Sequence, residues 1–129
     1  MSHCRSVRFG RVFSLALEPG DDILACAREA VFREKVADAV FLAGAGAVDG
    51  CRSHFAAKNE EGEYRDYPLS WSGPYSICAV QGFIERGQVH LHGVIGDKEG
   101  SWTVHIHEGC TCLGSFRLVF AELLGPKAP

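Results

Sequence analysis

The sequence predicts an α+β domain in which one principal helix packs on a mainly antiparallel, twisted β-sheet. Only one stretch has the apolar period of an amphipathic helix; one strand-like stretch precedes it and six or so follow it. Short turns join most of these stretches, which suits antiparallel pairing, and a single helix covers only one face of a sheet. A chain of 129 residues is large enough for one core and too small for two.

The first strand and the helix come at the start of the chain. Residues 9–18 are rich in β-forming side chains, and Pro19-Gly20 interrupts the strand. Asp21 or Asp22 then caps the helix, because a carboxylate at this position accepts free backbone N–H groups of the first turn. The helix extends to about Lys35, and its apolar stripe is formed by Ile23, Leu24, Ala27, Ala30 and Val31.

The middle of the chain predicts three more strands, over residues 37–42, 47–56 and, within the stretch 69–85, residues 76–85. The Gly44-Ala45-Gly46 segment between the first two serves either a turn or close backbone packing. A dinucleotide-binding loop is not expected there, since a strand and not a helix follows the glycines. The polar stretch 58–67 predicts a hairpin or loop, and Ser72-Gly73-Pro74 predicts a break before the last of these strands.

Residues 88–107 contain four of the six histidines, as two His-x-His pairs that flank a polar turn. Residues two apart share a face of a strand, so His90 and His92 share one, as do His105 and His107. A four-residue turn over 97–100 places His92 opposite His105 and His90 opposite His107. A five-residue loop would put the pairs on opposite faces and bury two imidazoles, so the four-residue turn is favoured. The apolar set on the other face is then Val89, Leu91, Ile95, Trp102, Val104 and Ile106.

The shared histidine face predicts a metal site. Neutral imidazole is the commonest protein ligand for zinc and similar ions, and three ligands from two strands leave one coordination position open. The alternative is a polar strand face of hydrogen-bonded histidines. Protons would compete with a metal for the same nitrogens, so occupancy should fall as the pH drops through about 6. A final strand over residues 111–124 completes the chain.

Composition and charge limit the compartment and the partners. No charged n-region with an apolar h-region begins the chain, and no apolar run of 18 residues could span a membrane, so we expect a cytoplasmic protein. The six cysteines include no C-x-x-C pair; we expect most to be buried and no disulfide framework. The net charge of −3 argues against tight independent binding of DNA.

Three motifs resemble those of the plant and prokaryote conserved (PPC) domain family. They are the opening G-R-V-F-S-L-A-L-E-P-G-D-D-I at residues 10–23, V-H-L-H at 89–92, and H-x-x-E-G at 105–109. The resemblance covers about residues 5–124, which we take as a single domain, with residues 1–4 and 125–129 as flexible termini. It implies a homotrimer and a metal, often zinc, near a subunit boundary. The implied ligands are His90, His92 and His105.

The chain departs from the family pattern beside its third histidine. Thr103-Val104 replaces the usual Gly-Gly, the segment is about one residue shorter, and His107 is an addition to the motif. Other members of the family are plant nuclear proteins whose AT-hooks read DNA, but no Arg-Gly-Arg-Pro hook occurs here.

Two classes of function stay open. One is a metal-binding protein that acts on or binds a small molecule, with His54, His107 and Glu108 as candidate helpers. The other is a DNA-associated regulatory or interaction module without catalysis. The sequence names no substrate.

Overall fold

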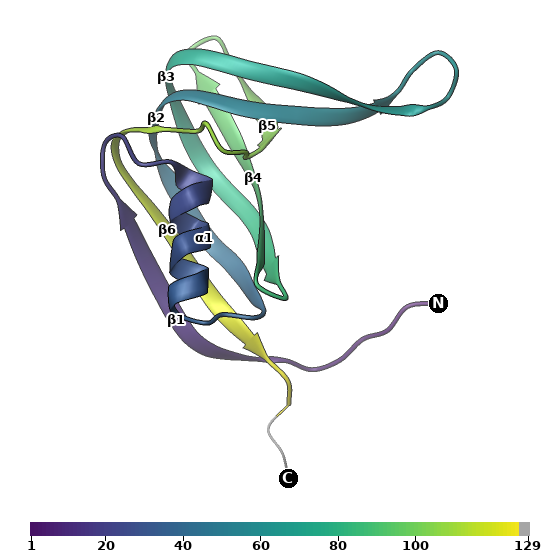
Figure 1. Ribbon diagram of the computed structural model, residues 1–129, viewed down its shortest axis with the longest axis vertical. Coiled ribbons are helices and arrows are strands. Elements are labelled where there is room, and N and C mark those ends of the chain that lie inside the picture. Colours follow the sequence, from purple (N-terminus) through teal and green to yellow (C-terminus); the bar gives the residue numbers. More distant parts are fainter. Residues whose placement is uncertain (127–129) are drawn as a thin grey trace.

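The computed structural model describes residues 1–126. Its elements are β1 (Arg8–Leu17), α1 (Ile23–Arg33), β2 (Ala39–Lys58), β3 (Tyr64–Glu85), β4 (Gln88–Asp97), β5 (Gly100–His105) and β6 (Cys112–Leu124). The strands form one antiparallel sheet in the order β1-β6-β2-β3-β4-β5, and α1 lies against one face of it (Figure 1). The predicted fold class, a mainly antiparallel sheet with one helix, is confirmed.

Two expectations concern the C-terminal tail and membrane spans. The predicted flexible tail is 125–129, and its last three residues lie outside the part of the chain that the structure describes. No helix among residues 1–126 is both long enough and apolar enough to cross a membrane.

The helix follows its sequence pattern closely. Asp22 is the N-cap, and its Oδ1 accepts a hydrogen bond from the Ala25 N–H at 2.9 Å. The buried residues of α1 are those of the predicted stripe: Ile23, Leu24, Ala27, Ala30 and Val31. The second carboxylate oxygen of Asp22 accepts from the Gly109 N–H at 2.6 Å. The cap therefore also fixes the segment that connects β5 to β6.

The second and third strands are longer than the sequence predicted, so within residues 1–126 five strands and not six follow the helix. β2 runs without interruption through Gly44 and Gly46, where a turn was one of the two predictions. A Cβ on Gly44 would lie 2.7 Å from the Cβ of Val80 and 2.8 Å from Leu118 Cδ2, so close packing is the reason for this glycine. The predicted break at residues 72–74 also lies inside a strand, β3.

The outer halves of β2 and β3 form a hairpin arm that extends past β4 and β5 (Figure 1). In this arm the two strands pair from Cys51 opposite Trp71 to Lys58 opposite Tyr64, and a register shift lies between Asp49 and Cys51. Such a shift bends a strand and increases its twist. The arm thus leaves the plane of the main sheet and carries His54 toward the end of β5.

The core lies between the helix and the covered face of the sheet. It includes Phe116, Phe120, Leu91, Ile95 and Ile106, each 2% exposed or less. Trp102 lies on the predicted face of the hairpin, opposite the buried Ile95, but it is not buried in the core. Trp102 lies on the edge strand β5, is 43% exposed, and contacts the arm through Trp71, with ring centroids 6.3 Å apart.

The cysteines differ from the expectation. Cys51 and Cys110 form a single disulfide that joins the base of the arm to the segment between β5 and β6, where no disulfide framework was expected. Cys112 is buried, but Cys4 and Cys78 are exposed and Cys26 is only half-buried. Half of the six, and not most, are buried small side chains.

Candidate metal centre

The hairpin of β4 and β5 has the register that the histidine pattern predicted. His92 pairs with His105, Gly96 with Ser101, and Asp97 with Gly100. The Asp97 Oδ1 accepts from the Glu99 N–H at 2.8 Å, which closes the turn. Because one step of register would turn every side chain to the other face, this pairing decides that the histidines of the two strands share a face.

Three histidines of this hairpin come together. The Nε2 atoms of His90 and His92 lie 3.0 Å apart, and the ring centroid of His105 lies 4.6 Å from that of His90 and 4.8 Å from that of His92. One ring nitrogen from each of the three lies within 4.8 Å of the others. These are the three residues that the family resemblance implied as metal ligands.

The fourth histidine of the pattern is placed differently from the prediction. His107 does not pair with His90, because β5 ends at His105 and the next residues cross toward β2. The Ile106 N–H still donates to the Leu91 carbonyl at 2.9 Å, but the His107 N–H donates to the Arg52 carbonyl at 3.4 Å. The ring of His107 nevertheless lies on the same histidine face, with its centroid 4.7 Å from that of His105.

His54 completes a row of five imidazoles. Its ring centroid lies 4.7 Å from that of His105 and 4.3 Å from that of His107, and its Nδ1 contacts the Nε2 of His107. Ser53, which is 5% exposed, holds the arm in this position: its Oγ accepts from the His105 N–H at 3.0 Å and donates to the His54 carbonyl at 3.3 Å. Sequence reasoning named His54 as a candidate but missed Ser53.

The donor set fits a zinc-like ion. In a tetrahedral site with zinc–nitrogen bonds of about 2.1 Å, the ligand nitrogens lie about 3.4 Å apart. His90 and His92 already approach this separation at 3.0 Å, and the whole trio lies within 4.8 Å. Two Nε2 atoms facing each other make a hydrogen bond only if one carries a proton, whereas both can point to one ion. The trio could hold a metal with small side-chain rotations.

The surroundings favour the neutral form of two candidate ligands, His92 and His105. Burial lowers the pKa of His105 to about 4, and the charges of His92, His107, His90 and His54 act in the same direction. Burial, followed by the charges of His90 and His54, also lowers the pKa of His92. A neutral imidazole is the form that binds a metal, so protons compete less at these two residues than at an ordinary histidine.

This shift predicts a pH-dependent stability in the metal-free protein. His105 has an ordinary pKa of 6.5 and a folded-state pKa of about 4, so the unfolded chain binds its proton first as the pH falls. The contribution to stability is present above pH 6.5 and is lost as the pH falls through about 4. We expect the thermal midpoint to drop across this window, and to drop less in His105→Gln. Equal pH profiles of the two proteins would contradict the expectation.

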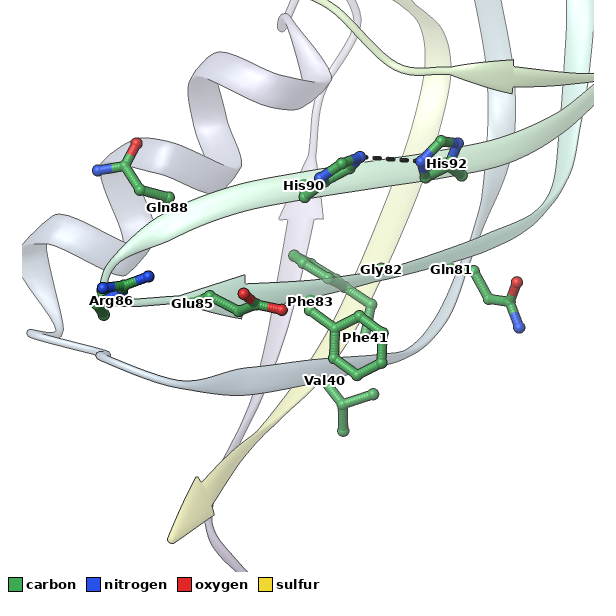
Figure 2. A pocket seen from close by; sticks show the side chains of 10 residues that line it. All are labelled: Val40, Phe41, Gln81, Gly82, Phe83, Glu85, Arg86, Gln88, His90 and His92. Atoms are coloured by element: carbon green, nitrogen blue, oxygen red, sulfur yellow. Dashed lines mark hydrogen bonds between the residues drawn. The ribbon is translucent and has the colours of Figure 1, made fainter. Parts of the chain in front are cut away.

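A cavity of about 740 Å³ adjoins two of the candidate ligands (Figure 2). Its lining includes His90 and His92 from β4, and the other residues are Val40, Phe41, Gln81, Gly82, Phe83, Glu85, Arg86 and Gln88. Phe83 pairs with His90 across β3 and β4 and is 52% exposed. Apart from His90 and His92, the cavity residues were not identified from the sequence, although the alternation of β3 against β4 could have indicated Gln81 and Phe83.

Glu108, the third candidate helper, is otherwise engaged. Its Oε1 lies 2.6 Å from Arg28 NH1, in an ion pair between two exposed side chains. The carboxylate is therefore paired with a side chain of α1, and Glu108 does not belong to either group of histidines.

Comparisons with known proteins agree with this architecture. The family model of the Plants and Prokaryotes Conserved (PCC) domain matches residues 4–123. A plant- and prokaryote-conserved protein from Pyrococcus horikoshii has a similar structure, with a TM-score of 0.77 and 22% identity over 98% of this chain and 87% of its own. No curated protein gave a match.

Two further solved structures share the fold, one of a metal-containing protein and one of a candidate DNA-binding protein. A metal-containing protein from Archaeoglobus fulgidus has a TM-score of 0.77 and 20% identity over 99% of this chain and 89% of its own. A candidate DNA-binding protein from Bacteroides thetaiotaomicron has a TM-score of 0.71 and 14% identity over 90% and 83%. The family match spans nearly the whole chain, and the fold and the histidine motifs agree with it. The chain therefore belongs to the Plants and Prokaryotes Conserved domain family.

Proposed function

We propose that this protein binds a divalent metal ion, zinc, through His90, His92 and His105. The observation that carries the proposal is the convergence of one ring nitrogen from each residue within 4.8 Å. Three neutral imidazoles are a ligand set that suits zinc, and a three-ligand site leaves one coordination position for water or a ligand. The metal-containing relative from Archaeoglobus fulgidus is consistent with this role.

The role of such a metal is to act on, or to hold, a small molecule. A zinc ion with an open position supplies Lewis-acid chemistry when it is bound. The cavity beside His90 and His92 offers apolar surface from Phe83 and Val40 and polar groups from Gln81 and Arg86. A small ligand with an apolar body and a metal-binding or acidic group fits this lining. The histidine trio and the cavity beside it support binding of a small molecule, and an enzymatic step on that molecule is an extension of this proposal.

Elemental analysis tests the proposal directly. Protein purified without a histidine tag and dialysed against metal-free buffer should retain about one zinc ion per chain, as a three-histidine site of this kind does. Thermal shifts against a metabolite panel, with and without the metal, should then identify ligands that need the ion. Protein that retains no metal after zinc loading and dialysis would contradict the proposal.

We also propose that the protein is a homotrimer with the metal near a subunit boundary. The face of the sheet opposite α1 supports this, because apolar side chains there are exposed: Val12 58%, Leu42 48% and Phe83 52%. Each lies beside a core-facing neighbour in its strand, so alternation points it away from the helix. Light scattering should give three times the 14.0 kDa chain mass. A monomer at micromolar concentration would contradict the trimer.

A DNA-associated role without catalysis is the second candidate, favoured by the description of the relative from Bacteroides thetaiotaomicron. The charges oppose it. The net charge is −3, and Arg11, in the basic N-terminal stretch, is paired with Glu122 at 2.8 Å and with Glu34 at 3.6 Å. Binding of phosphates draws its affinity from unpaired basic side chains.

We therefore expect weak binding to duplex DNA. A fluorescence-anisotropy titration at physiological salt should give no specific complex in the nanomolar range that is typical of specific readers. Binding of one duplex at nanomolar affinity, with a steep salt dependence, would favour the DNA-associated role instead.

A further inference from the structure

A second group of histidines lies beside the first. One ring nitrogen from each of His54, His105 and His107 lies within 4.8 Å of the others, and all three residues are half-buried. We propose that His54 and His107 form a second divalent-metal position, with His105 shared between the two positions, so that the chain can hold two ions. The inference extends the proposed metal binding, but its own ligands, His54 and His107, are not part of the first position.

Two hydrogen bonds and one disulfide connect the segments that carry His54 and His107. The His107 N–H donates to the Arg52 carbonyl, and the His105 N–H donates to Ser53 Oγ. The disulfide between Cys51 and Cys110 joins the same two segments, and each cysteine is three residues from one of the histidines. The arm and the segment after β5 therefore cannot separate easily, and the imidazoles are preorganised against each other.

The positions of the rings suit a common metal ion. His107 Nε2 and His54 Nδ1 are in contact, so two nitrogens that can bind a metal lie next to each other. The centroid of His105 lies 4.7 Å from that of each of these two rings, and at similar distances from His90 and His92 on its other side. His105 is thus central in the row and can serve an ion on either side.

The charges around the second position tolerate a cation. Arg28 and Asp66 both lie within electrostatic range of His107, and their charges oppose each other there. The Arg28 guanidinium is paired with Glu108 at 2.6 Å, which reduces its repulsion of an ion. Imidazole ligands select zinc, copper or nickel over calcium and magnesium.

The second position should bind more weakly than the first. His54 and His107 must move apart to admit an ion, and His105 serves only one ion at a time, which leaves the other position with two histidines and water. We expect the second zinc to bind at least about tenfold more weakly than the first, the range associated with a lost supporting group. Dialysed protein then retains the first ion, and the second is seen only on titration.

Zinc titration followed by equilibrium dialysis and metal analysis tests the inference, with Zn²⁺ alone as the probe. The wild-type chain should saturate at two ions. His54→Gln and His107→Gln should each saturate at one and retain the tight ion, and His92→Ala should also saturate at one but lose the tight ion. His3→Ala is the matched control, because His3 is exposed and distant in sequence from the row, and it should behave as wild type. Circular dichroism of each variant checks that the fold is kept.

The outcomes separate the two positions. Saturation of the wild-type chain at one ion overturns the second position, whether or not the His54 and His107 variants change the affinity. Two ions that persist in both glutamine variants overturn it as well. If instead the His90 and His92 variants change nothing while the glutamine variants remove the metal, the second position stands and the first one fails.

Discussion

His92→Ala is expected to remove most of the metal that survives dialysis. The residue is one of three proposed protein ligands, and its Nε2 lies 3.0 Å from that of His90. Loss of groups that only support a ligand already weakens metal sites by 10- to 100-fold, so loss of a ligand itself should cost at least about 100-fold. We expect the zinc content of dialysed protein to fall below roughly a tenth of the wild-type value.

The fold should survive this substitution. His92 lies on the face away from the core, whereas its neighbour Leu91 is fully buried and pairs with Gly82 of β3. Far-ultraviolet circular dichroism should therefore match that of wild type, and His3→Ala should retain its metal. If dialysed His92→Ala protein keeps its zinc undiminished, the site at His90, His92 and His105 is wrong; if the zinc is also kept when His54→Gln is added, the histidines of β4 and β5 form a polar strand face.

The pH dependence of metal retention follows from the same residues. A fall in occupancy near pH 6 is the expectation for ordinary histidines. The pKa of His105 is lowered to about 4 and that of His92 is lowered as well, in both cases chiefly by burial. These two ligands stay neutral further into the acidic range, so the loss of metal should begin below the pH expected from sequence.

The register of the histidine hairpin was predictable because two independent patterns agree on it. The pairing of His92 with His105 puts the imidazoles on one face and the aliphatic residues Leu91, Ile95 and Val104 on the other, whereas a shift by one residue would mix them. The helix was predictable for a similar reason, since the cap at Asp22 and the apolar stripe of α1 are both local in sequence.

What the sequence left open or missed at Gly44, His107 and the disulfide depends on contacts between distant segments. The sequence left a turn and close packing open for Gly44, and only the structure shows that its absent side chain makes room for Val80 and Leu118 from other strands. The position of His107 depends on a hydrogen bond to Arg52, 55 residues earlier in the chain, and the disulfide joins residues 59 apart. The periodicity of a single strand carries no information on such contacts, so the sequence could suggest the approach of His54 to His105 without fixing it.

Gly82→Ala should be the most destabilising single change near the site. A Cβ at this position would lie 2.0 Å from the carbonyl oxygen of His90 and 3.1 Å from the Cα of Leu91, both backbone atoms of the neighbouring strand. The φ angle of +154° adds strain for a residue with a side chain. Since backbone atoms cannot move aside as a flexible side chain does, we expect a loss of about 3 kcal/mol or more in the free energy of unfolding.

The comparison with Gly114→Ala isolates this effect. Gly114 lies in β6, and a Cβ there would meet nothing within 4 Å, so this variant should change stability by less than about 0.5 kcal/mol. Urea unfolding at one fixed protein concentration gives both values, because assembly makes stability depend on concentration. Equal midpoints for the two variants would contradict the close approach of β3 to β4. The metal site should be affected as well, because displacement of the His90 carbonyl moves the strand that carries His90 and His92. Any Gly82→Ala protein that folds should therefore bind zinc more weakly than Gly114→Ala.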